Sequence, residues 1–269
     1  MHGAKTIAKG LMFLALAIAA PPSAQAQDTT SYAGAMQALI DLVARTDAAP
    51  AAADPVFVRA RREAETLRDV IGTPKFPITQ LSTMNGLCVP ALNVMLAYFD
   101  IGLAARTKAA TSDAARQAIK QQVETENAAR YFDQVLPFML LNVRCNASHM
   151  PVIENFVAAI PAGQMTPAQF DGISQIRGGA RDQVQGLITG ASDPAAGETR
   201  RLALLGELAH DIDLMLLGLA PPDKAGAVQA ITALRPKLSV AAKARADTIA
   251  AALTNSKCGR ICSVVIPAH

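Results

Sequence analysis

The chain has 269 residues, of which 51% are hydrophobic, 17% charged and 4% aromatic, and it contains no tryptophan. This composition excludes an intrinsically disordered chain, which would be rich in charge and poor in apolar residues. The 25 Lys and Arg residues against 22 Asp and Glu leave a net charge of +3, too weak and too scattered for a nucleic-acid-binding protein. We therefore expect a globular protein with no nucleic acid among its partners.

Residues 1–26 have the three parts of a secretory signal peptide. Two lysines form a positive start, an unbroken apolar run covers 11–20, and Ala24-Gln25-Ala26 is a small-x-small cleavage site. As a helix the run is about 15 Å long, half of the roughly 30 Å hydrocarbon core, so we do not expect a membrane anchor. The pattern predicts export to a periplasm or to the exterior, with 27–269 as a mature chain that has no membrane span.

Helical periodicity and helix start signals dominate the first half of the mature chain. Asp54-Pro55 is an N-cap followed by a proline at the first helical position, and Ser112 or Asp113 begins a later helix. Pro137 predicts a kink or break just before it. The expected elements are a helix over 32–45, a helix from 55 to Gly72, a loop over 73–87, a helix over about 89–106 and a long helix from 113 to 144.

Start signals continue in the second half. Thr166-Pro167-Ala168-Gln169 is a capping box with proline at the first helical position, and Asp193-Pro194 is expected to start the next helix. The expected elements are helices over 151–160, from 167, from 194, over 223–234 and from 236 to about 253, and an extended tail over 261–267. No strand-turn-strand pattern is found elsewhere in the sequence.

These elements predict an all-α fold, a bundle of about eight or nine helices in antiparallel pairs. A mature chain of this size buries a sufficient core as one domain over 27–269. Two sub-bundles, 27–160 and 161–269, are also compatible with the pattern.

Four cysteines lie in the mature chain, and an even number in an exported protein predicts two disulfides that staple the bundle. Antiparallel packing of the helices 89–106 and 113–144 brings the start of the first near the end of the second, which favours a Cys88–Cys145 bond. In the alternative, Cys88 and Cys145 are each bonded to one of the two C-terminal cysteines.

The remaining bond would then join Cys258 and Cys262. Cysteines four apart on a regular helix are too far apart at Cβ for a bridge, so this bond requires a turn, which Gly259 favours. The functional alternative is a redox pair or a soft-metal site. Two thiolates do not complete a coordination shell, and the spacing differs from C-x-x-C, so we favour a structural bond.

The E-x-x-H pattern of Glu207 and His210 is the one motif with a known chemical use. Glu and His three apart project from one side of a helix, as in the di-iron carboxylate bundles, and Asp213 lies close enough to add a ligand. A di-iron site needs a second such motif, which the sequence lacks, and His210 points away from the main apolar face. We expect a polar stripe here, with Glu207, His210 and Asp213 as the candidate metal ligands. A mononuclear site would need His149 or Glu154 in addition.

Gly172, Gly179 and Gly186 are seven residues apart and therefore lie on one ridge of their helix. We expect this ridge to pack closely against an alanine-rich neighbour such as the last helix, over 241–252. The alternative is a groove for an external helix or a thin apolar ligand.

The sequence holds no G-x-S-x-G elbow and no phosphate-binding glycine loop, and it identifies no catalytic residue and no cofactor. It therefore favours a non-enzymatic exported module with a binding, adaptor or structural role, whose partner is a protein or a small apolar ligand. The alternative is a metal-dependent or redox enzyme that uses Glu207, His210 and Asp213, or the pair Cys258 and Cys262.

Overall fold

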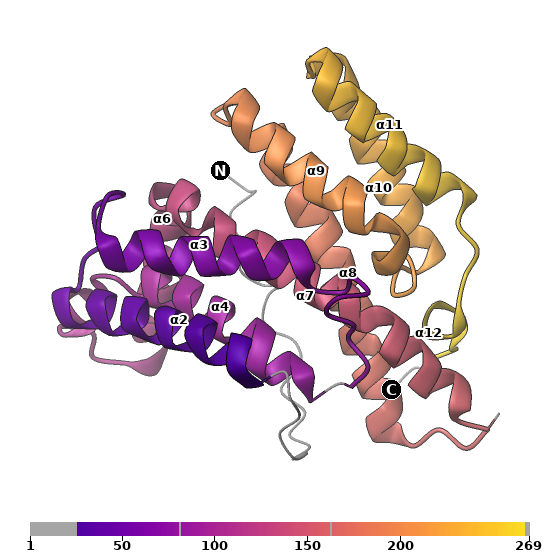
Figure 1. Cartoon of the computed structure of the whole chain (residues 1–269), viewed down its shortest axis with the longest axis horizontal. Helices are drawn as coiled ribbons and strands as arrows, with labels where there is room; N and C mark the ends of the chain where they lie inside the picture. The colour runs from indigo at the N-terminus through magenta and orange to yellow at the C-terminus, as the bar shows by residue number, and fades with distance from the viewer. Residues whose placement is uncertain (1–25, 81, 162, 267–269) are drawn as a thin grey trace. The chain divides into compact units, whose positions relative to one another are not determined.

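The structure, a computed structural model, describes residues 26–80, 82–161 and 163–266 (Figure 1). These residues form eleven α-helices and one 3-10 helix, with no strand in the described ranges. The predicted all-α multi-helix fold is confirmed, with more helices than the eight or nine expected. Residues 1–25, most of the predicted signal peptide, lie outside the described part. Within the described part, every helix is too short or too polar to span a bilayer.

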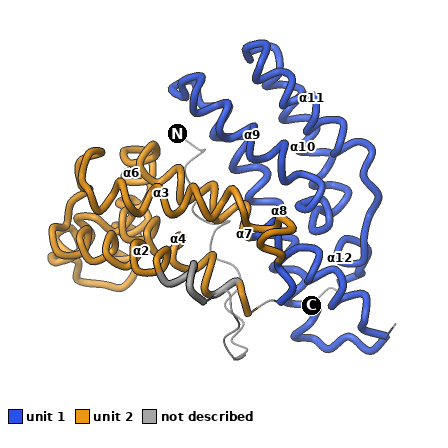
Figure 2. The backbone as a smooth tube through the Cα atoms, in the orientation of Figure 1, with its two compact units in different colours: residues 1–16, 78–81, 146–269 blue, residues 17–77, 82–145 orange. Residues whose placement is uncertain are grey.

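The chain divides into two compact units (Figure 2). Of the described residues, unit 2 takes 26–77 and 82–145, and unit 1 takes 78–80 and 146–266. The division near residue 160 that the sequence allowed is not where the units change. The change falls inside one long helix, after Cys145.

In unit 2, helices α3 and α4 both pack against α2, while α6 packs against α4 and α5. The Asp54 side chain accepts from the Val56 N–H at 2.8 Å, and the Ser112 side chain accepts from the Ala115 N–H at 3.1 Å, so both predicted helix starts are confirmed. The helices are α2 (Ala26–Thr46), α3 (Pro55–Val70), α4 (Thr83–Phe99), α5 (Leu103–Thr107), α6 (Asp113–Arg130) and the first part of α7 (Phe132–Ala159).

The apolar helix expected over 89–106 differs at both ends, since α4 runs from Thr83 to Phe99. Asn127 caps the end of this helix. Its buried side-chain amide donates to the carbonyl of Phe99 at 2.9 Å and to the carbonyl of Ile101, just after the helix, at 2.8 Å. The chain then turns through Gly102 at φ 75° into the short α5. Carbonyls at a helix end need a partner, and here the partner is 28 residues away, outside any local pattern.

The break expected just before Pro137 lies at Tyr131, and the separate helix expected over 151–160 does not exist. Helix α7 continues through Pro137 and Pro151 to Ala159. A proline inside a helix costs roughly 3 kcal/mol. Residues 137–145 are all buried, and each large apolar side chain among them contributes about 1.5–3 kcal/mol, which outweighs that cost.

Unit 1 stacks its helices around α8 and α9. Helix α8 packs against α9, α10 and the short α12, and α11 packs against α9 and α10. The predicted capping box is confirmed: the Gln169 N–H donates to the Thr166 hydroxyl at 3.3 Å, and the Thr166 N–H donates to the Gln169 side chain at 2.8 Å. Besides the end of α7, the elements are α8 (Pro167–Ser192), α9 (Glu198–Met215), α10 (Pro221–Leu234), η1 (Arg235–Lys237), α11 (Val240–Asn255) and α12 (Arg260–Ser263).

Two expected elements of unit 1 are wrong. Asp193 ends α8 instead of starting a helix, because its carboxylate accepts from the Ala195 N–H at 2.9 Å in a turn, and α9 begins later, at Glu198. The tail expected to be extended from 261 folds into α12 over its first residues.

The helix that the sequence expected beside the glycine ridge of α8, over 241–252, is α11, and it is not among the main neighbours of α8, which are α9, α10 and α12. A Cβ at Gly172 would meet nothing within 4 Å. Close approach occurs instead at Gly218, just after α9, where a Cβ would lie 2.9 Å from the Ala180 Cβ and 2.7 Å from the Met150 Cε. Gly218, and not Gly172, is therefore a packing glycine.

These two glycines give a paired prediction. The methyl group added by Gly218→Ala pushes against Ala180 and Met150, so we expect the free energy of unfolding to fall by about 1–3 kcal/mol. Gly172→Ala meets no clash and removes the extra backbone freedom of a helical glycine. We expect it to raise the free energy of unfolding by up to ~1 kcal/mol. Urea unfolding of both variants measures the difference, and a Gly218→Ala protein as stable as the parent would contradict the packing role.

Candidate functional site

The three candidate metal ligands on α9 do not converge. Glu207 is buried, Asp213 is exposed, and the His210 side chain is 63% exposed. The His210 Nδ1 lies 2.8 Å from a carboxylate oxygen of the fully buried Asp211. His210 and Asp211 therefore form a local polar contact between neighbouring residues of α9.

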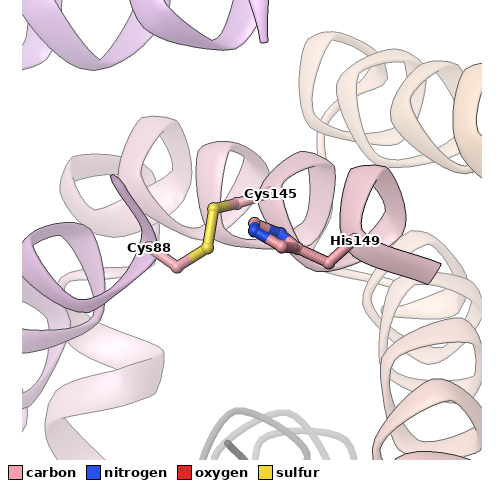
Figure 3. A group of neighbouring side chains, drawn as sticks. All are labelled: Cys88, Cys145 and His149. Carbon is pink, nitrogen blue, oxygen red and sulfur yellow. A yellow bond between two sulfur atoms is a disulfide. The ribbon is translucent and has the colours of Figure 1, made fainter. Parts of the chain in front are cut away.

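One group of three donor atoms does gather in the described ranges of the chain. The sulfurs of Cys88 and Cys145 and the imidazole of His149 lie within 4.8 Å of one another, and all three residues are buried (Figure 3). His149 follows Cys145 by one turn of the same helix, which places its ring beside the disulfide. The two sulfurs are bonded to each other, with a Cα–Cα distance of 5.7 Å, and metals bind the thiolate form of cysteine. In the disulfide state the group is a covalent staple with an adjacent imidazole.

The second disulfide joins Cys258 and Cys262, with a Cα–Cα distance of 5.4 Å. Both pairs are the ones favoured from the sequence. Cys258 precedes Gly259, the N-cap of α12, and Cys262 lies within that four-residue helix. The bond therefore spans a turn and not a regular helix, as its spacing requires. We call residues 258–264 the C-terminal turn.

The carboxylate of Glu154, on α7, holds the beginning of the C-terminal turn. Its Oε2 accepts from the Ile261 N–H at 2.9 Å, and its Oε1 accepts from the Arg260 N–H. A Cβ at Gly259 would lie 2.6 Å from the Glu154 Oε1, so a side chain at this position would require the carboxylate to shift from its present place. The negative charge lies where the N–H groups of α12 lack helical partners.

The guanidinium of Arg177, on α8, holds the other end. Its Nε donates to the Ile261 carbonyl at 2.9 Å, and its Nη2 donates to the carbonyls of Cys262 at 2.7 Å and Val264 at 2.6 Å. Burial lowers the pKa of Arg177, and the carboxylate of Asp223 opposes this shift. Three carbonyls at the end of α12 thus share one cation.

A third helix contacts the residues just before the C-terminal turn. The buried Lys224, on α10, donates from Nζ to the Ser256 hydroxyl at 3.0 Å, and burial lowers the pKa of its ammonium group. Below these polar contacts, the fully buried Ile261 packs in a core with Ile153, Val157, Ile173 and Met150. Side chains from α7 and α8 therefore fix the C-terminal turn, and Lys224 of α10 fixes the residues just before it.

This site was only partly accessible from the sequence. The sequence indicates Gly259 and the two cysteines, and it offers Glu154 only as a distant metal ligand. Arg177 and Lys224 carry no local signal, because Arg177 contacts residues 84–87 positions away and Lys224 contacts one 32 positions away.

The chain shows no match to a protein-family model, to a curated protein or to a solved structure.

Removing the Arg177 guanidinium tests its role in the turn. We expect Arg177→Met to lower the free energy of unfolding by about 2 kcal/mol and to raise amide hydrogen exchange in 258–264, since three carbonyls lose a charged donor. Arg181→Met, one turn later on α8, is the matched control, because the Arg181 side chain is exposed and pairs with Asp182. Equal effects of the two substitutions would refute the assignment.

The exposed His210 gives a second test. We expect His210→Ala to change the free energy of unfolding by no more than about 0.5 kcal/mol and to leave any metal content unchanged, because the imidazole is mostly exposed and its contact with Asp211 is only partly buried. Thermal unfolding and elemental analysis measure both quantities. Loss of a stoichiometric metal in the variant would restore the metal-site interpretation of α9.

Proposed function

We propose that this chain is an exported, non-enzymatic helical module with a binding, adaptor or structural role, stapled by two disulfides. The observation that carries the proposal is the pairing of all four cysteines, which leaves no free thiol. Disulfides persist in oxidising compartments such as a periplasm or the extracellular space. This supports the export that residues 1–26 predict.

The use of the charged side chains supports a non-enzymatic role. Glu154 and Arg177 bind backbone groups of the C-terminal turn, and Lys224 binds the Ser256 hydroxyl just before it. A catalytic group must instead reach a reacting atom of a substrate. The polar atoms of these three residues hold one segment of the fold.

The proposed partner is a protein or a small apolar ligand. Phe156 and Val265 of unit 1 are large apolar residues that are exposed to solvent. Such side chains supply the apolar contacts found at the centres of protein interfaces. Both kinds of partner therefore remain within the proposal.

Native mass spectrometry of the full chain, expressed with export to an oxidising compartment, tests the proposal. We expect a mass that fits cleavage after Ala26 and two disulfides, without a bound metal or redox cofactor. A co-purified apolar molecule would identify the ligand of a binding module. A stoichiometric metal, a redox cofactor or retention of residues 1–26 after export would overturn the proposal. Unfolding in acid before the same measurement separates covalent from non-covalent additions.

A further inference from the structure

The two disulfides differ sharply in exposure. Cys88 and Cys145 are 4% and 0% exposed, whereas Cys258 is exposed and its partner Cys262 is 6% exposed. A disulfide is opened by a thiolate that attacks one sulfur while the other leaves, so access to a sulfur decides which bond reacts and at which atom. An external thiol can therefore approach the C-terminal bond at Cys258 in the folded protein, but has no comparable approach to the Cys88–Cys145 bond.

The backbone of the C-terminal turn is held without help from its disulfide. Glu154 receives the N–H groups at one end, Arg177 donates to the carbonyls at the other, and Ile261 is buried between them. None of these contacts involves a sulfur atom. Reduction of the bond leaves all of them in place, so the two thiols remain close enough to form the bond again.

From these two observations we infer that Cys258 and Cys262 form a reversible thiol–disulfide exchange site that reacts with a dithiol protein at Cys258. The inference stands apart from the proposed function, which uses this bond only as a staple. The exposed Lys257 and Arg260 flank Cys258 and favour the approach of an anionic thiolate, while the Glu154 carboxylate is engaged by backbone N–H groups.

The exchange balances in two steps. A thiolate of the dithiol protein attacks the Cys258 Sγ, the Cys258–Cys262 bond breaks, and Cys262 leaves as a thiolate that takes up a proton. The second thiol of the partner loses its proton and attacks the partner sulfur that is bonded to Cys258, and Cys258 leaves as a thiolate that takes up a proton. The partner loses two electrons and becomes a disulfide. The C-terminal pair gains the same two electrons and becomes two thiols.

Graded reduction of the folded full chain tests selectivity, with the buried disulfide as internal control. The protein is treated for a fixed short time with increasing dithiothreitol, alkylated and analysed by peptide mass spectrometry, so that the result reports the rate at which each bond opens. We expect Cys258 and Cys262 to be alkylated at a reductant concentration at least ~10-fold below that needed for Cys88 and Cys145. Simultaneous opening of both bonds, or earlier opening of Cys88–Cys145, would overturn the inference.

Two single variants test the point of attack. Cys262→Ser leaves a thiol at Cys258, and Cys258→Ser leaves a thiol at Cys262. We expect the Cys258 thiol to react with an aromatic disulfide reagent at least ~10-fold faster in the folded protein, and the two to react at equal rates in urea. Faster reaction of Cys262 in the folded state, or equal rates, would refute attack at Cys258.

Reversibility has a separate test. After mild reduction, the protein is transferred to defined mixtures of reduced and oxidised glutathione. We expect the parent to re-form the Cys258–Cys262 bond, and Arg177→Met to need a several-fold more oxidising ratio for half re-formation, because its two thiols are held less closely. Arg181→Met should match the parent. A reduced parent that fails to re-form the bond, or an Arg177→Met midpoint equal to that of the parent, would overturn the inference.

Discussion

A helix of one turn cannot satisfy its own backbone, because its N–H groups and its carbonyls all lie at its ends. Helix α12 is such a helix, and the arrangement of the C-terminal segment follows from this constraint. Glu154 supplies acceptors at one end and Arg177 donors at the other, from two different helices. A side chain at Gly259 would require the Glu154 carboxylate to shift. The charged groups of Glu154 and Arg177 are both engaged by backbone atoms of the turn.

The two disulfides contribute to stability in different ways. Cys88 and Cys145 are 57 positions apart, while Cys258 and Cys262 are four apart. In the chain-entropy account, the longer loop stabilises the folded state by about 4 kcal/mol and the shorter by about 2 kcal/mol. The buried bond is therefore the main covalent constraint on unit 2. The exposed bond closes a turn that polar contacts already hold.

The polar residues of α9 combine a ligand-like spacing with unequal burial. Glu207 and His210 have the spacing that places two ligands on one side of a helix. In the fold, Glu207 is buried while His210 points to solvent and meets Asp211. A metal centre needs convergence from several elements, and spacing within one helix does not provide it.

The sequence by itself determined the all-α class, the helix starts at Asp54, Ser112 and Thr166, and the favoured pairing of the cysteines. These features depend on local periodicity, on capping chemistry and on the reach of a disulfide. Tertiary structure decided what local rules cannot weigh: α7 continues through Pro137 because its surroundings are buried, and α4 ends at Phe99, where Asn127 meets its carbonyls. The C-terminal turn was likewise decided by Arg177, which lies more than 80 positions away in the chain and reaches it only through folding.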